Sequence, residues 1–196
     1  MKTVQINTYS FSELSDKAKE KALNHYRYLN VDYADWDEYI LEEEEKKLES
    51  LGYSDVNILY SGFWTQGDGA CFTASIDIKK WLEAHKLTNK YKLLYVNSEL
   101  VTMTLIHNNY YCHSTTTELE DICYFQDLPE AKKEKLYRQV NEIEKLILEE
   151  REELGDNIYK TLQQAYVTKI SDEAVRDTIE ANEYYFLEDG GLFNII

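Results

Sequence analysis

The chain has 196 residues, 43% of them hydrophobic, a length and composition that fit one folded domain and exclude wholesale disorder. Its 37 acidic and 21 basic residues give a formal net charge of −16, which argues against direct binding to nucleic acid or anionic lipid and favours basic partners. No stretch approaches the roughly 18 apolar residues of a membrane span, so no membrane partner is expected. The three cysteines lack metal-type CxxC spacing, and we expect free thiols in a reducing cytoplasm.

The N-terminal part is predicted to form a short strand followed by two helices. Apolar and polar residues alternate up to Tyr9, which is typical of a strand. An apolar residue at every fourth position predicts a helix over residues 14–29. A second helix fits residues 36–51, and Gly52 then supplies the C-terminal stop.

The central part changes to the twofold period of strands. Residues 56–79 are predicted to form a β-hairpin, because alternation resumes in Ala70–Ile78 after a glycine-rich turn. One or two short helices are expected over residues 79–94. A second hairpin is expected over residues 101–117, with Asn108-Asn109 as its two-residue turn.

The C-terminal third returns to helical spacing. An apolar stripe from Leu136 to Ala165 predicts one long helix over residues 128–169, although Gly155 leaves a helical hairpin as an alternative. Ser171 is a candidate N-cap for a further short helix, and the last residues fit a small hairpin or edge strand. Residues 1–196 are therefore expected to form a single α+β domain: an antiparallel sheet of about four strands, helices packed on one face and a long C-terminal helix.

The most unusual segment of the chain is the glycine-rich turn. It lacks the further elements of a phosphate-binding loop, and we favour a structural role set by backbone geometry. A small-ligand site at the Gly62–Cys71 turn is the alternative. Its candidate residues are Trp64, Gln66, Gly67, Asp68, Gly69 and Cys71.

Metal and thiol chemistry are the next candidates. His107, Cys112 and His113, with Asp68 as a fourth ligand, have the right side chains for zinc. With a two-residue turn at Asn108-Asn109, however, His107 and His113 fall on opposite faces, and no metal site is predicted. Cys71 lies on the polar side of its predicted strand, where a nucleophile would need a histidine base that the sequence does not identify. We therefore predict no catalytic residues and no cofactor, and we lean against an enzyme.

Two runs of carboxylates fall on predicted helices. Such runs are usually solvated helix faces, and the alternative is an acidic rail that binds a basic partner. The candidate partner-binding residues are Glu42, Glu43, Glu44, Glu45, Glu149, Glu150, Glu152 and Glu153.

Three segments carry a family resemblance. Residues 61–72 resemble the S-G-F-[WY]-[ST]-Q-G-D-G-A-[SC]-F segment of an uncharacterised family found in bacteriophages and other mobile elements. Residues 9–19, and the tail over residues 171–174 and 181–190, are also similar to that family. The resemblance implies no catalytic or binding residue. It implies a phage accessory protein, some of which inhibit host defence systems.

Charge and resemblance lead to one preferred function and two alternatives. We expect a non-enzymatic phage-type accessory protein, in the cytoplasm of an infected or element-carrying bacterial cell. Its acidic surface would engage a basic, nucleic-acid-binding host protein and would not bind nucleic acid directly. The alternatives are an enzyme or small-ligand-binding protein with a site at the Gly62–Cys71 turn, and a self-associating scaffold that dimerises through the long helix.

Overall fold

A computed structural model of the chain describes residues 5–32 and 35–193. Length favours one domain, and the contacts within the chain group it into two compact units. The first unit combines residues up to 37 with residues from 163 onward, and the second unit consists of residues 38–162.

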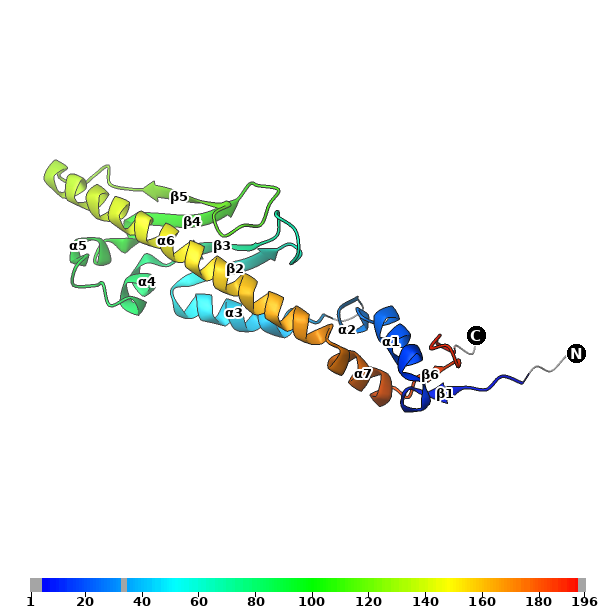
Figure 1. The fold of residues 1–196 in the computed structure, drawn as a ribbon. Coiled ribbons are helices and arrows are strands. Elements are labelled where there is room, and N and C mark those ends of the chain that lie inside the picture. Colours follow the sequence, from blue (N-terminus) through cyan, green and yellow to red (C-terminus); the bar gives the residue numbers. More distant parts are fainter. Residues whose placement is uncertain (1–4, 33–34, 194–196) are drawn as a thin grey trace, which may run out of the picture. The chain divides into compact units, whose positions relative to one another are not determined.

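The second unit is built on a four-stranded antiparallel sheet (Figure 1). Its strands are β2 (Tyr53–Tyr60), β3 (Ala70–Ile76), β4 (Val101–His107) and β5 (Thr117–Cys123), and each pairs with the next. The expected α+β class, with about four antiparallel strands and a long C-terminal helix, is confirmed.

Both hairpins of this sheet have longer connections than the turn signals predict. Tyr60 pairs with Ala70, so residues 61–69 form the β2–β3 loop. His107 pairs with Thr117, so residues 108–116 form the β4–β5 loop and the predicted two-residue turn at Asn108-Asn109 is wrong. Pairing from Thr117 onward sets Leu119 opposite the buried Leu105, while Tyr110 and Tyr111 stay exposed in the loop.

Three helices of the second unit precede the C-terminal one. Helix α3 (Glu38–Ser50) packs on β2 and ends before Gly52, whose φ of 100° favours glycine. Helix α4 (Ile78–Ala84) starts at Asp77, whose side chain accepts a hydrogen bond from the Lys80 N–H at 3.1 Å. Helix α5 (Lys92–Tyr95) is a single turn and precedes the 3₁₀ turn η2 (Ser98–Leu100).

Helix α6 (Glu130–Lys169) is continuous, which decides between one helix and a hairpin. The expected apolar stripe is buried, but between Ile147 and Ile158 it runs through Arg151 and Gly155 and bypasses Leu154. Gly155 is therefore part of the inner face of the helix. Among the residues that the structure describes, no helix has both the length and the apolar character to cross a membrane.

The first unit joins elements from both ends of the chain. They are β1 (Tyr9–Ser10), η1 (Phe11–Glu13), α1 (Asp16–His25), α2 (Leu29–Asp32), α7 (Asp172–Ala181) and β6 (Tyr185–Phe186). Strands β1 and β6 are antiparallel, and Ser15 and Ser171 cap α1 and α7. The core of the unit consists of Phe11, Leu14, Ala18, Ala22, Val175, Ile179 and Phe186. The predicted N-terminal strand is thus reduced to Tyr9–Ser10, and its first residues, 1–4, lie outside the described part of the chain.

Candidate functional site

Asp68 holds the glycine-rich loop in shape. Its Oδ2 accepts hydrogen bonds from the backbone N–H groups of Trp64 and Thr65, both at 2.7 Å, and its Oδ1 accepts from the Thr65 hydroxyl at 2.7 Å. The Thr65 N–H is the main reason why the pKa of Asp68 is lowered from its usual value. Because both carboxylate oxygens are engaged inside the loop, Asp68 has a structural role, as favoured for this turn.

The glycines of this turn let the β4–β5 loop approach its backbone. A Cβ atom on Gly69 would lie 2.8 Å from the carbonyl oxygen of Cys112, which is closer than real Cβ contacts allow. A Cβ atom on Gly67 would lie 3.1 Å from the ring of Tyr111. The two loops, residues 61–69 and 108–116, therefore pack together at one end of the sheet, as Figure 1 shows.

This packing brings Cys71, His107 and Cys112 together, and we call these three residues the Cys/His cluster. Cys71 is the second residue of β3, His107 is the last residue of β4, and Cys112 lies in the β4–β5 loop. One ligand atom from each side chain lies within 4.8 Å of the other two. Residues 108–116 form a loop, so the alternation of side chains along a strand does not apply to them. Cys112 can therefore lie beside His107.

The cluster differs from the residue set considered in the sequence. His107 and Cys112 belong to it, but Asp68 and His113 do not. Cys71, expected on an exposed face, is only 1% exposed, with the Cys112 thiol and the Thr116 hydroxyl beside it. The expected two-residue turn at Asn108-Asn109 leaves no loop that could cover Cys71, whereas the β4–β5 loop does cover it. Burial raises the pKa of the Cys71 thiol to about 11, which is the opposite of what an activated nucleophile needs.

Glu150 is the centre of a second polar cluster, the Glu150 network. Its Oε2 accepts hydrogen bonds from the hydroxyl of Tyr53 at 2.8 Å and from Nε1 of Trp81 at 2.7 Å. Its Oε1 lies 2.5 Å from Nε2 of His85, whose Nδ1 is 2.7 Å from the Trp81 carbonyl oxygen. Burial, followed by the charge of Glu150, raises the pKa of the Tyr53 hydroxyl. Glu150 therefore ties α6 to β2 and α4 and is not available to a partner.

The predicted acidic runs are also unequal in exposure. In α3, Glu44 is buried and pairs with Lys47 at 2.7 Å, while Glu43 pairs with Lys46 at 3.0 Å and Glu45 is half-buried. Glu42 is exposed but lies near the same Lys46. In α6, by contrast, Glu149, Glu152 and Glu153 are exposed. Four of the eight predicted residues are thus exposed, three of them on α6.

Sequence reasoning missed three exposed residues near these groups. Asp156 follows Glu149 by seven residues and extends the exposed face of α6, a spacing visible in the sequence. Tyr110 and Tyr111 are exposed in the β4–β5 loop. In sequence they read as strand residues, so only the true length of the loop identifies them.

The remaining residues of the glycine-rich turn divide between core and surface. Phe63 is buried and packs on Tyr159 of α6, with ring centroids 5.7 Å apart, whereas Trp64 is 68% exposed. Gln66 is exposed, and Gly67 and Gly69 are covered to different extents by the β4–β5 loop.

The long-helix stripe is used inside the chain. Leu136, Val140, Ile143, Ile147 and Ile158 are at most 1% exposed. These five residues, on which the expected dimerisation through α6 depends, are therefore part of the core of the second unit.

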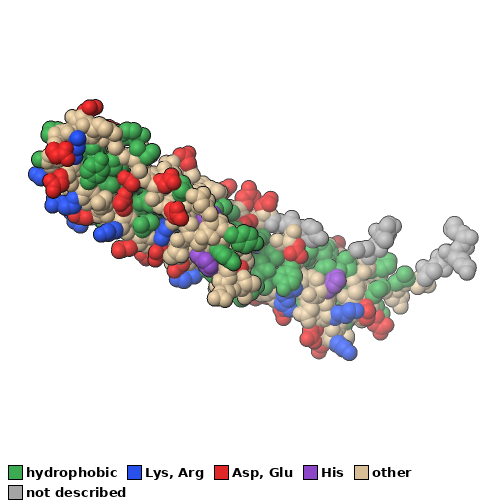
Figure 2. All heavy atoms as spheres, turned by 90° about the horizontal axis from the view of Figure 1, so that it is seen from above, with side chains coloured by type: hydrophobic (Ala, Val, Ile, Leu, Met, Phe, Trp, Pro, Cys, Tyr) green, Lys and Arg blue, Asp and Glu red, His purple; other side chains and the backbone are tan. Residues whose placement is uncertain are grey.

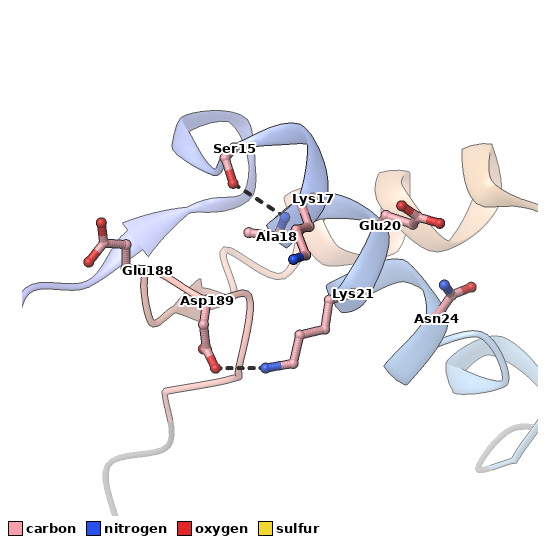
Figure 3. A pocket seen from close by; sticks show the side chains of 8 residues that line it. All are labelled: Ser15, Lys17, Ala18, Glu20, Lys21, Asn24, Glu188 and Asp189. Atoms are coloured by element: carbon pink, nitrogen blue, oxygen red, sulfur yellow. Dashed lines mark hydrogen bonds and ion pairs between the residues drawn. The ribbon is translucent and has the colours of Figure 1, made fainter.

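A hollow in the first unit lies between α1 and the turn that carries Glu188 and Asp189 (Figure 3). Lys21 reaches across it to Asp189, with an Nζ–Oδ2 distance of 2.6 Å, and both side chains are more than half exposed. Much of its lining is charged, and this exposed ion pair points to a solvated surface.

Comparisons with known proteins give one match. Residues 36–172, more than half of the chain, match a family described as "Domain of unknown function (DUF8835)". No curated protein and no solved structure matches the chain.

Proposed function

We propose that this chain, which belongs to the DUF8835 family, is a non-enzymatic binding protein whose second unit engages a basic protein partner through an acidic and aromatic surface. The resemblance to phage and mobile-element proteins makes it an accessory protein in this proposal. Its partner would then be a nucleic-acid-binding protein of the host, such as a defence nuclease.

The outward face of α6 is the observation that carries the proposal. Glu149, Glu152, Glu153 and Asp156 are all exposed and follow one another at helical spacing, so they share one side of the helix, which we call the acidic face. The opposite side is buried at Ile147, Arg151, Gly155 and Ile158. Like charges at this spacing cost about 0.2–0.5 kcal/mol per pair, a cost that binding to a cationic surface would offset.

Charge along the second unit is unevenly distributed. In Figure 2, Lys and Arg side chains are mixed with Asp and Glu side chains at the end where α6 begins, and Asp and Glu side chains also occur along the rest of the unit. The first turns of α6 carry Lys132, Lys133, Lys135 and Arg138, and the acidic face begins eleven residues later. A basic partner is therefore directed to the later part of the helix.

Exposed aromatic rings lie on loops that contact this part of α6. Tyr110 is 90% exposed, and Trp64 and Tyr111 are also exposed. Trp and Tyr are enriched among residues that dominate binding energies, and their rings bind the cations of Lys and Arg.

Two contacts connect the loops to the helix. A Cβ atom on Gly155 would lie 2.8 Å from Cβ of Ser114, which places the β4–β5 loop against α6. Phe63 of the β2–β3 loop packs on Tyr159 of α6. Carboxylates and rings that accept cations thus occur on neighbouring segments of the same unit.

Affinity capture from a host lysate tests the proposal when it uses matched variants. The test variant replaces the acidic face (E149Q, E152Q, E153Q and D156N). The control variant makes the same charge change at exposed positions of the first unit (E20Q, E173Q, D177N and E180Q). We expect a basic protein that is captured by the wild type and the control, is lost with the test variant and is released as salt rises. Equal capture by both variants would contradict the proposal.

A further inference from the structure

The Cys/His cluster has the donor atoms and the spacing of a metal site. Zinc bonds are about 2.3 Å to sulfur and 2.0–2.1 Å to nitrogen, so the ligand atoms of a tetrahedral site lie roughly 3.5–3.8 Å apart. The ligand atoms of Cys71, His107 and Cys112 lie within 4.8 Å of one another. Their separations therefore exceed those of a tetrahedral zinc site by no more than about 1 Å.

The hydrogen bond of His107 fixes which ring nitrogen is free. Nε2 lies 3.0 Å from the carbonyl oxygen of Tyr111. A carbonyl oxygen only accepts, so Nε2 carries the proton, and Nδ1 is the nitrogen that a neutral ring would offer to a metal. Histidines that bind metals usually donate their other N–H to a carbonyl or carboxylate in this way, which orients the ring.

The loop that supplies Cys112 is held in place by its own contacts. The backbone N–H and the hydroxyl of Thr116 both donate to the carbonyl oxygen of His113, at 2.9 and 2.7 Å. The Tyr111 N–H donates to Oδ1 of Asn109 at 3.1 Å. Together with the close approach of the Cys112 carbonyl oxygen to Gly69, these bonds hold the backbone that carries Cys112 in place.

Exposure differs across the cluster in a way that suits ion entry. Cys71 is buried in β3, whereas His107 and Cys112 are half-exposed. An ion would therefore reach the cluster from the side of the β4–β5 loop. The open side leaves room for a fourth ligand from solvent.

We infer that Cys71, His107 and Cys112 bind a thiophilic divalent metal ion of the zinc class, with water as the fourth ligand. Two thiolates and an imidazole favour Zn²⁺ over Mg²⁺ and Ca²⁺, which prefer oxygen ligands. The inference is independent of the acidic face, because none of the three ligands belongs to it.

Titration of the full chain with Co²⁺ tests the inference directly. The protein is stripped of metal with a chelator, kept reduced with a phosphine and titrated with Co²⁺, followed by competition with Zn²⁺. We expect one ion per chain, a thiolate-to-cobalt charge-transfer band in the near ultraviolet, and displacement of Co²⁺ by Zn²⁺ with a Kd tighter than about 1 µM. Absence of the thiolate band in the reduced protein would overturn the inference.

Ligand variants locate the site. Cys112→Ser and His107→Gln each remove one half-exposed ligand and should weaken Zn²⁺ binding by about 100-fold or more. The matched controls are Cys123→Ser and His25→Gln, which lie outside the cluster and should bind Zn²⁺ like the wild type. Circular dichroism confirms that each variant is folded. Wild-type affinity in both folded ligand variants would overturn the assignment.

Discussion

Glu150 and the Cys/His cluster are both polar groups inside the second unit. They differ in how many of their polar atoms already have hydrogen-bond partners within the protein. The Glu150 carboxylate has hydrogen-bond partners on Tyr53, Trp81 and His85, from two different elements. The ligand atoms of the Cys/His cluster instead lie within 4.8 Å of one another, and the hydrogen bond of His107 to the Tyr111 carbonyl oxygen engages only its Nε2. The first arrangement holds elements together, whereas the second can accept an ion.

The difference shows how to distinguish a structural polar cluster from a binding one. Buried polar groups are normally satisfied by partners within the protein, as Glu150 is. Sulfur and imidazole atoms that point toward one another gain little from weak S–H hydrogen bonds, so a metal adds much more stability there.

Removal of the Glu150 carboxylate should have the largest effect. Glu150→Ala leaves the donors of Tyr53 and Trp81 buried without an acceptor, and we expect a loss of about 3–5 kcal/mol in the free energy of unfolding. Glu150→Gln keeps an oxygen acceptor and places an amide toward His85, so it should lose less than half as much. Urea unfolding of the three proteins measures this. Equal losses for the two variants would show that the hydrogen bonds to Glu150 are not the cause.

Zinc should have the next largest effect on stability. Binding to the folded chain at a free Zn²⁺ concentration 100 times its Kd raises the free energy of unfolding by about 2.7 kcal/mol. The Cys112→Ser variant should gain almost nothing, while Cys123→Ser should gain as much as the wild type. Thermal unfolding with and without Zn²⁺ measures the shift. A similar gain in Cys112→Ser would mean that zinc acts elsewhere.

Gly155→Ala should be destabilising although alanine is the better helix former. The new Cβ would lie 2.8 Å from Cβ of Ser114 and 3.0 Å from the Ala70 carbonyl oxygen. The helix gains about 1 kcal/mol from alanine but overpacking costs about 1–3 kcal/mol, and we expect a net loss of about 1 kcal/mol.

A second substitution separates the cost of the contact with Ser114 from the gain in helix propensity. Ser114→Gly removes the nearest clashing side-chain atom, so Gly155→Ala should be less costly in that background. The difference between the two backgrounds, measured by urea unfolding, gives the coupling energy. If Gly155→Ala costs the same in both backgrounds, a Cβ atom at position 155 does not clash with Ser114.

The acidic-face variant should have the smallest effect on stability, and of opposite sign. Replacing Glu149, Glu152, Glu153 and Asp156 by amides removes several like-charge contacts, each worth about 0.2–0.5 kcal/mol. We expect a gain of about 0.5–1 kcal/mol at low salt that shrinks as salt rises. A substantial loss would mean that these carboxylates stabilise the fold, as Glu150 does.

Local signals in the sequence predict the helices well. The predicted N-cap Ser171 caps α7, and the predicted stop Gly52 follows the end of α3, because capping and chain reversal depend on residues within one turn. Apolar residues predict the inner face of α6 up to Ile147. They do not predict Arg151 and Gly155 on this face, because a buried arginine and a helical glycine are explained only by their neighbours in space. Arg151 donates to the Thr117 carbonyl oxygen, and Gly155 makes room for Ser114.

The Cys/His cluster could be predicted only in part. His107 and Cys112 stand out as ligand types, but Asn108-Asn109 has the composition of a two-residue turn. The nine-residue loop is instead set by pairing of β5 with the buried part of β4, which is a tertiary effect. A wrong turn length changes the predicted strand partner of every residue after the turn. For this reason the sequence does not predict that Cys112 lies near Cys71.

The order of the units along the chain has a consequence for how the protein could be divided. The second unit is one uninterrupted segment inserted between the two halves of the first, whose core takes Phe11 and Leu14 from one end and Val175 and Ile179 from the other. Truncation at either terminus would remove half of that core. Residues 38–162 form a contiguous segment that contains both the Cys/His cluster and the acidic face, but its C-terminal junction falls inside the continuous helix α6, so an excised segment should keep this helix to Lys169.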